Sequence, residues 1–407
     1  MLAKAGRSLL AAFCLAVPVH ASAQTLPAGP IRAFDGRVAV SGEVVATAGS
    51  ADEVAFFNYT GYEHNVLRMF RLALAGSWQP VDRVALVGEV RSEDFDQVVA
   101  YAAYLRVRPW GGRRFDLQAG RIPPVFGAFG RTYTGDNPVI GYPLAYQYLT
   151  SLRPDAVPAT ADDLLRMRGR GWRSSFPVGS YYEGPGVPLV TAFRWDTGVQ
   201  ARWTSRPIEV TGAITAGTLS DPQVGDNNDG RQLSGRIAWR PVTGLVAGLS
   251  AARGRWLADD VTDILPEALA SRDFHQTAVG ADAEYSRDHW LLRGELVWSR
   301  WTVPLAAFAD RDQRLGALGS WVEARYRLTP RIFTSARADR LAFSRIRGTL
   351  FEGRPTPWDA PVWRIEAGGG YYLQRNLTAR ATVQHNRRDG GRIRHRTFVS
   401  GQLSYWF

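Results

Sequence analysis

The sequence predicts an all-β protein, a closed transmembrane antiparallel β-barrel of about sixteen strands with one long loop folded inward. Apolar residues alternate with charged ones at a period of two along most of the chain, which is typical of strands with one apolar face. The predicted connections alternate between tight turns and longer polar loops, as in membrane barrels. The chain has 407 residues and lacks any run of about 18 apolar residues that would form a membrane helix.

The first 23 residues have the features of a secretory signal peptide. Lys4 and Arg7 precede the apolar residues 9–19, and an A-x-A cleavage motif follows at residues 21–23. Loss of Lys4 and Arg7 lowers the 49 basic residues to 47, against 38 acids, and lowers the formal charge from +11 to +9. The only cysteine also leaves, so the exported chain has no disulfide to stabilise it. The barrel is expected in residues 24–407.

Each predicted strand has an apolar face and a charged face. Between Arg231 and Arg240, for example, Leu233 and Ile237 lie on the face opposite to Arg236. A closed barrel suits this pattern, because closure leaves no unpaired strand edge in lipid. The predicted strands are 35–49, 65–79, 82–93, 97–109, 113–122, 191–206, 208–220, 230–241, 244–257, 273–287, 289–302, 315–330, 331–346, 360–375, 376–389 and 394–407.

Aromatic residues gather near the turn-side ends of these strands. Amphipathic rings favour the interface between a membrane and water, so this placement supports a membrane barrel. A soluble secreted all-β protein is the alternative fold, but it would point its charged faces into its own core. The aromatic residues are Trp78, Trp110, Trp203, Trp239, Trp290, Tyr326, Tyr371, Tyr405 and Trp406.

One predicted connection, residues 123–190, is far longer than the others. Its many prolines exclude a strand through most of it, and its many aromatic rings need a surface to pack against. Thr160 as N-cap and Asp163 three residues later predict a short helix, and residues 144–153 are a second helix candidate. A loop of this length is expected to be functional.

The last residues resemble the C-terminal signature by which the outer-membrane assembly machinery recognises barrels. The chain ends in Phe407, with Tyr405 and Leu403 at alternate positions before it. With sixteen strands and a long loop after the fifth, the chain resembles the porin superfamily of Gram-negative bacteria, which includes general diffusion porins and phosphate-selective porins. No motif assigns a subfamily. The resemblance implies a location in the cell outer membrane, a third external loop that constricts the pore, and a homotrimer, which is common in the family.

Arginine and acidic side chains on the predicted inner faces suit a water-filled lumen. The predicted lumen-wall residues are Arg106, Arg236, Arg293, Arg325, Arg337, Arg364, Arg380, Glu89, Glu295, Glu323 and Glu366, and the inner faces also include Arg108, Asp116 and Arg202. The predicted constriction residues in the long loop are Arg131, Arg153, Arg166, Arg168, Arg170, Arg173, Asp162 and Asp163. Arginine is in excess, although a single arginine can equally brace the wall by pairing with a neighbouring acid.

These observations predict a porin that lets small hydrophilic solutes diffuse passively, with a preference for anions. Two alternatives remain: a barrel enzyme of the lipase or protease type, and a non-conducting adhesin or scaffold barrel. No G-x-S-x-G or H-E-x-x-H motif occurs, and the acidic run from Asp226 to Gly230 lacks the full spacing of a calcium loop, so no catalytic residue, metal or cofactor is predicted. The expected partners are membrane lipid, lipopolysaccharide, the assembly machinery and the solutes, but not nucleic acid.

Overall fold

The computed structural model describes residues 26–27, 29–53, 55–59, 64–110, 114–129, 137–191, 195–308 and 311–407. The expected signal peptide, residues 1–23, and the predicted constriction residue Arg131 lie outside the described residues. In the described ranges no helix is long and apolar enough to cross a membrane.

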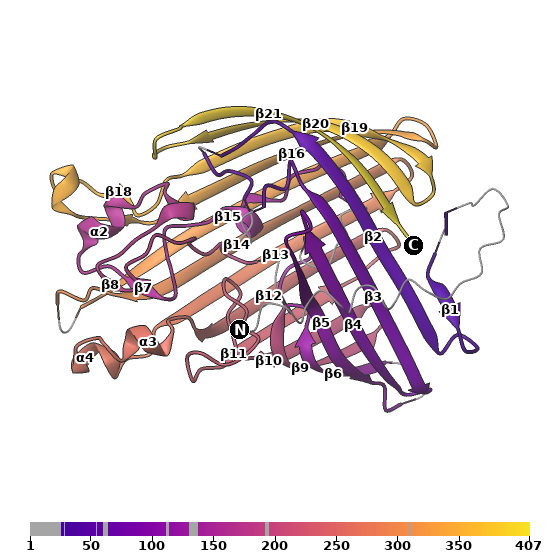
Figure 1. Cartoon of the computed structure of the whole chain (residues 1–407), viewed down its shortest axis with the longest axis horizontal. Helices are drawn as coiled ribbons and strands as arrows, with labels where there is room; N and C mark the ends of the chain where they lie inside the picture. Colours follow the sequence, from indigo (N-terminus) through magenta and orange to yellow (C-terminus); the bar gives the residue numbers. More distant parts are fainter. Residues whose placement is uncertain are drawn as a thin grey trace, which may run out of the picture.

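A closed antiparallel β-barrel of sixteen strands forms the wall, as predicted (Figure 1). Successive wall strands pair along the chain, and β2 pairs with both β3 and β21, which closes the sheet. A further strand, β1 (Ile31–Ala33), adds a hairpin to β2. The sixteen wall strands are β2 (Val38–Gly49), β3 (Phe70–Val81), β4 (Val84–Glu93), β5 (Gln97–Val107), β6 (Phe115–Ile122), β9 (Asp196–Ser205), β10 (Ile208–Thr215), β11 (Gln232–Trp239), β12 (Leu245–Arg255), β13 (His275–Arg287), β14 (Trp290–Pro304), β15 (Asp312–Arg327), β16 (Ile332–Phe343), β19 (Val362–Gln374), β20 (Leu377–Arg388) and β21 (His395–Trp406).

The two ends of the barrel differ in their connections. At the short-turn end, on the right in Figure 1, tight turns such as 82–83 and 288–289 join the strands. At the long-loop end, connections such as 50–69 and 123–195 contain the remaining elements. These are α1 (Leu144–Gln147), α2 (Ala161–Arg166), α3 (Asp259–Thr262), α4 (Glu267–Ala270), η3 (Gly171–Arg173), η4 (Thr349–Phe351), and the hairpins β7 (Ala156–Val157) with β8 (Val178–Gly179) and β17 (Arg345–Ile346) with β18 (Thr356–Pro357).

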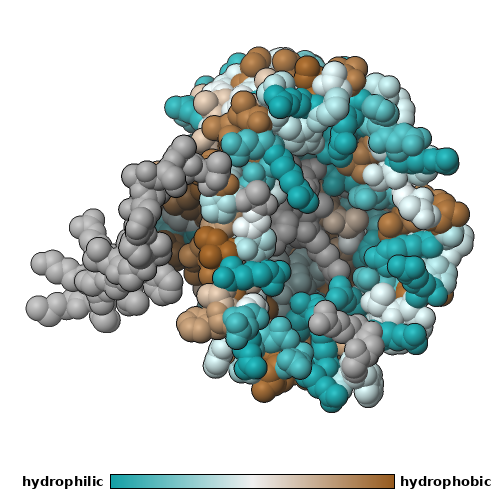
Figure 2. Space-filling model, turned by 90° about the vertical axis from the view of Figure 1, so that its right-hand side faces the viewer, coloured by the Kyte–Doolittle hydropathy of each residue, from teal (hydrophilic) through white to brown (hydrophobic). Residues whose placement is uncertain are grey.

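Side chains alternate between the two faces of the wall. On β14, Leu292 and Leu296 are exposed on the outside, whereas Arg293 and Glu295 are buried inside. Seen from the short-turn end in Figure 2, hydrophilic side chains surround the mouth of the barrel and many hydrophobic ones lie at its outer edge. The exposed apolar band is the surface that a bilayer requires of a transmembrane barrel.

Aromatic side chains mark the short-turn end of the outer wall. The exposed rings there belong to Trp78, Trp203, Trp239, Trp290 and Tyr371, all of which the sequence placed near the turns. Amphipathic rings at this level suit the boundary between hydrocarbon and water.

Each predicted strand is present, and the differences lie at the strand ends. The strand predicted from residue 65 begins at Phe70, because Asn65 accepts a hydrogen bond from the N–H of Leu67 (3.0 Å) and starts a turn. The strand predicted to residue 220 ends at Thr215, because the next residues turn back and the N–H of Gly217 donates to Asp196 Oδ1 (3.0 Å).

The two helices predicted in the long loop differ in outcome. The capping box of Thr160 and Asp163 at the start of α2 is confirmed. The helix expected over residues 144–153 is wrong in its extent, because it ends at Gln147 where Tyr148 is extended. The single helical turn that forms, α1, packs against β15 and β16 of the wall.

The seam of the barrel includes the C-terminal residue. The N–H of Phe407 donates to the carbonyl of Gly42 (3.0 Å) and its carbonyl accepts from the Gly42 N–H (3.1 Å). The ring of Phe407 covers Gly42, since a Cβ there would lie 2.7 Å from Cε1 of the ring. The seam therefore requires glycine at residue 42.

We expect Gly42→Val to displace the Phe407 ring and to lower the folded fraction, with an overpacking cost of about 1–3 kcal/mol. Gly76→Val on β3 is the matched control, because nothing lies within 4 Å of a Cβ at that position. The heat-modifiable band on a gel measures the folded fraction. Equal folding of the two variants would contradict the role of residue 42 in the seam.

Candidate functional site

Charged side chains on the inner wall pair across neighbouring strands. Arg71 on β3 binds Glu93 on β4, with 2.6 Å between Nη2 and Oε1. Arg293 on β14 binds Glu323 on β15 through the same atoms at 2.6 Å. In each pair the two residues are at most 12% exposed, so each charge depends on its partner and not on water.

Arg337 on β16 is the centre of a larger network. Its guanidinium lies 3.0 Å from Asp339 Oδ2, 3.1 Å from Glu366 Oε2 and 3.6 Å from Glu323 Oε2. The side chain is fully buried. A guanidinium has five N–H donors in a planar fork, so a single arginine can serve several carboxylates at once.

The same wall residues hold the backbone of the long loop, residues 123–190. Arg337 Nη1 donates to the carbonyl of Gly141 (2.9 Å), and Glu366 Oε1 accepts from the N–H of that residue (3.0 Å). Arg364 Nη1 donates to the carbonyl of Tyr142 (2.9 Å). Asp339 accepts from the N–H of Leu144, and Arg380 donates to the carbonyl of Asn137. We call the wall residues that make these contacts the loop clamp: Arg337, Asp339, Arg364, Glu366 and Arg380.

Apolar packing completes the attachment of the loop. The ring of Phe129 lies 5.1 Å from that of Tyr146 and 6.0 Å from that of Trp321 on β15. Tyr146 donates to Glu295 Oε1 (2.8 Å), and Trp321 Nε1 donates to the second oxygen of that carboxylate (3.1 Å). Gly319 on β15 lets the loop approach closely, because a Cβ there would lie 2.8 Å from Cβ of Ala145. The loop therefore folds inward and packs on the wall, as predicted.

Loop 50–69 is tied to the same wall. Arg364 Nη2 donates to the carbonyl of Phe57 (2.8 Å), and the N–H of Asn58 donates to Asp52 Oδ2 (2.8 Å). Burial raises the pKa of the Asp52 carboxyl to about 7, although the Asn58 hydrogen bond and the charge of Arg364 act in the opposite direction. Burial also raises the pKa of Asp359, in the loop before β19.

The opposite wall has a different arrangement. Three arginines surround the single carboxylate of Asp116 on β6: Arg106 and Arg108 lie 2.6 and 3.0 Å away, and Arg202 lies 3.7 Å away. The side chains of the three arginines are 26%, 29% and 32% exposed. One carboxylate cannot neutralise three arginines, so this arginine triad presents excess positive charge to the lumen.

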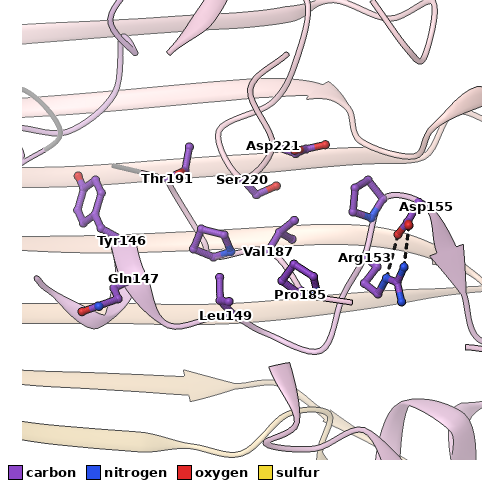
Figure 3. Close-up of a pocket in the computed structure, with 13 residues that line it drawn as sticks. Tyr146, Gln147, Leu149, Arg153, Asp155, Pro185, Val187, Thr191, Ser220 and Asp221 are labelled. Carbon is purple, nitrogen blue, oxygen red and sulfur yellow. Dashed lines mark hydrogen bonds and ion pairs between the residues drawn. The ribbon is translucent and has the colours of Figure 1, made fainter. Parts of the chain in front are cut away.

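A small pocket lies between the long loop and the loop after β10, with a volume of about 210 Å³. In Figure 3, Arg153 and Asp155 pair at one end, and Tyr146 and Gln147 lie at the other. Gly186 permits the close passage of two loop segments, because a Cβ there would overlap the carbonyl oxygen of Thr150. The pocket combines one ion pair with a mostly apolar lining.

No family model matches this chain, and no curated protein matches it. Solved structures do match its fold. The outer membrane channel DcaP of Acinetobacter baumannii has a TM-score of 0.55 at 9% identity, over 93% of this chain and 100% of DcaP. OmpF of Salmonella typhi, in complex with daunomycin, has a TM-score of 0.53 at 11% identity, over 93% of this chain and 100% of OmpF.

A trimer form of OmpT, an outer membrane protein of Vibrio cholerae, has a TM-score of 0.53 at 10% identity, over 91% of this chain and 99% of OmpT. The fold is that of the outer-membrane porins. Identities this low show the fold alone and assign no porin subfamily.

The predicted lumen-wall residues divide between two environments within this porin fold. Most of them are buried where the loop meets the wall: Arg293, Glu295, Glu323, Arg337, Arg364, Glu366 and Arg380. Of the others, Arg106 belongs to the arginine triad, Arg236 pairs with Asp282, Glu89 pairs with Arg91, and Arg325 donates to the hydroxyl of Tyr372. The period-two pattern thus identifies inward-facing residues, but it does not distinguish those buried against the loop from those elsewhere on the inner wall.

Of the predicted constriction residues that the structure describes, those from Asp162 to Arg173 lie in or near α2, at the long-loop end (Figure 1). Asp162 accepts from Thr349 and from the N–H of Leu350, and these bonds lower its pKa. Arg166 pairs with Asp163 (3.0 Å) while 59% exposed, and Arg168 donates to the carbonyl of Asp389 (3.1 Å). Arg170 and Arg173 are exposed, and Arg153 is buried and pairs with the exposed Asp155. Asp162 and Arg168 thus join the long loop to other loops, whereas residues 137–147 contact the clamp.

Sequence reasoning missed Asp339 and Asp52 as members of the site. Asp339 alternates with Arg337 on β16, so the period-two pattern contained the signal for its inward position. Asp52 is in an irregular loop, where no periodicity indicates a partner. In the described ranges, no group of three or more His, Cys, Asp or Glu residues gathers as a metal site.

Arg364→Gln should release the two loops that the clamp holds. The change leaves the carbonyls of Phe57 and Tyr142 without their donor, and loss of one partner in a buried network costs about 3–5 kcal/mol. Limited proteolysis of the folded barrel should then cleave residues 50–59 and 137–153 faster. The matched control is Arg354→Gln, since Arg354 and its partner Glu352 are each 79% exposed. Equal cleavage of the two variants would show that the clamp does not hold the loops.

The turn from Asp52 to Asn58 should loosen as the pH rises. Between pH 3.8 and about 7 the folded protein keeps a proton on Asp52 that the unfolded chain has lost, so stability falls through this window. Hydrogen exchange at the Asn58 N–H, corrected for its intrinsic rate, should be faster at pH 8 than at pH 5. Asp52→Asn should abolish the difference, and Asp82→Asn at the opposite end should retain it. If the difference in exchange between pH 8 and pH 5 persists in Asp52→Asn, another titrating group causes it.

Proposed function

We propose that this chain is an outer-membrane porin through which small hydrophilic solutes diffuse passively, with no chemical step. The observation that carries the proposal is the closed sixteen-strand wall, with an apolar outer face, a charged inner face and a loop folded into its lumen. A barrel of this size encloses more space than its own side chains fill. The long loop then narrows the lumen instead of capping it from outside.

The arginine triad supports a preference for anions. Arg106, Arg108 and Arg202 share one carboxylate and remain partly exposed on the wall opposite the clamp. Fixed charge on the wall of a narrow passage selects ions by electrostatics at close range. The clamp arginines contribute little to selectivity, because buried acids and loop carbonyls already surround them.

The proposed location and partners follow from the same features. An exported barrel with this outer wall belongs in the outer membrane, in contact with lipid and lipopolysaccharide. Phe407 at the seam suits recognition by the barrel assembly machinery. The trimer form of OmpT makes a homotrimer the assembly to test first.

A salt gradient across a planar bilayer tests both conduction and selectivity. The wild-type protein should conduct ions, and the sign of its reversal potential should indicate that anions permeate more readily than cations. Removal of the triad in R106Q/R108Q/R202Q leaves Asp116 unpaired, so the preference should weaken or invert. R83Q/R114Q/R287Q removes the same charge from exposed positions at the short-turn end and should leave the potential unchanged.

Absence of conductance by a folded, heat-modifiable barrel would overturn the porin proposal and favour a non-conducting barrel. Lipase and protease assays on the same folded sample address the enzyme alternative. Equal reversal potentials for the two triple variants would overturn the role of the triad while leaving conduction in place.

A further inference from the structure

Arginines interrupt the apolar outer wall over one half of the barrel, toward the long-loop end. They occupy outward-facing positions on β12, β14, β15, β16 and β20. The other outward residues of these strands are mainly apolar. All five are exposed. We call them the outer arginine belt: Arg253, Arg300, Arg314, Arg340 and Arg387.

Three members of the belt lie close together across β12 to β15. Arg253 pairs in register with Thr277, which pairs in turn with Arg300. Two strand spacings of about 4.8 Å therefore separate the first and last of these backbones. Arg314 is the diagonal neighbour of Arg300, because Arg300 pairs with Gly316, two residues along β15. Three guanidiniums and a hydroxyl thus face outward from one patch.

The other two members flank a tryptophan. Arg340 pairs with Trp363, and Trp363 pairs with Arg387 on its other side. In the first group, Arg300 lies over the ring of Trp298, 5.3 Å from the ring to the guanidinium carbon. Tryptophan on the outer wall favours the level of the lipid headgroups, so the belt lies where headgroups are.

The belt has no acidic counterpart on the wall. Along the outward faces of β12 to β16 and β19 to β21, which the structure describes in full, the only acid is Asp312 at the tip of β15, and it pairs with Arg272 (3.6 Å). Within the described part of the chain, none of the five guanidiniums forms a hydrogen bond or an ion pair with another residue. Charge so close to hydrocarbon is costly unless an anion meets it.

The opposite half of the wall differs at the same end. Most outward positions there are apolar, as at Ala48, Phe70 and Ile214. The outward arginine of β6, Arg121, donates hydrogen bonds to the backbone carbonyls of Trp195 and Ala100. Its guanidinium is therefore already bound by the protein. The belt is therefore a local feature and not a general excess of charge at the rim.

We propose that the outer arginine belt binds the phosphate groups of a phosphorylated lipid in the outer leaflet. Lipid is what brings phosphate to the outer wall of a membrane barrel, and guanidinium forks match phosphate with two hydrogen bonds each. Below the first group, exposed Leu249, Leu296 and Leu318 offer a surface for acyl chains. A free phosphate ion would use the arginines but not this apolar surface. The inference rests on the proposed membrane location and is independent of conduction.

The test compares R253Q/R300Q/R314Q with R83Q/R114Q/R287Q, which removes the same charge at the short-turn end. The probes are lipid A with two phosphates, its dephosphorylated form and inorganic phosphate, and native mass spectrometry of the folded full chain in detergent counts the bound lipid. Diphosphorylated lipid A should bind the wild type and the control equally, and the belt variant roughly hundredfold more weakly.

Three results would overturn the assignment: equal binding by the belt variant and the control, equal binding of dephosphorylated lipid, or displacement by millimolar inorganic phosphate. The last would identify a site for free anions. Conductance of the belt variant should match that of the wild type. Failure of lipid binding with normal conductance thus refutes this inference alone, and failure of conductance refutes the porin proposal.

Discussion

Every backbone N–H and C=O group of a strand in lipid must find its partner within the sheet, and the remaining features of this chain follow from that constraint. The seam between β2 and β21 meets it by closing the wall on itself, with Phe407 continuing the pairing to Gly42. Once the wall is closed and its outside is mainly apolar, most charged side chains of the strands lie on the inside. The inner wall then has to satisfy many charges in a confined space.

The chain solves this second problem by placing the long loop among those charges. Arg337 serves three carboxylates and a loop carbonyl, and Arg364 serves two loop carbonyls and Asn386. Loop backbone thus replaces the water that an open lumen would supply. A planar guanidinium with five donors suits this role better than an ammonium group, which gives a physical reason for arginine on the inner wall where lysine is absent.

The sequence was sufficient for the wall and insufficient for the contacts made by the loop. Alternation over segments such as Leu377 to Arg388 determines which side of the sheet each residue faces, because a strand has only two faces. It cannot show whether an inward arginine meets water, as Arg202 partly does, or a loop carbonyl, as Arg364 does, since the loop itself has no period. Charge density therefore favours the arginines from Arg166 to Arg173, whereas isolated residues such as Asp339 bind the loop. Arg340 and Arg387 break the apolar pattern singly, so only the closed sheet places them together.

The two halves of the interior consequently have different physical roles. On β16 and β19, Arg337 and Arg364 are fully buried and bound to loop backbone, so they fix the position of the loop and present no free charge. Across the lumen the triad arginines keep 26–32% of their side chains exposed, with one carboxylate among them. Because the loop is fastened to the first wall, any passage left beside it borders the second. We infer that solutes pass along β5, β6 and β9, where the arginine triad supplies excess positive charge.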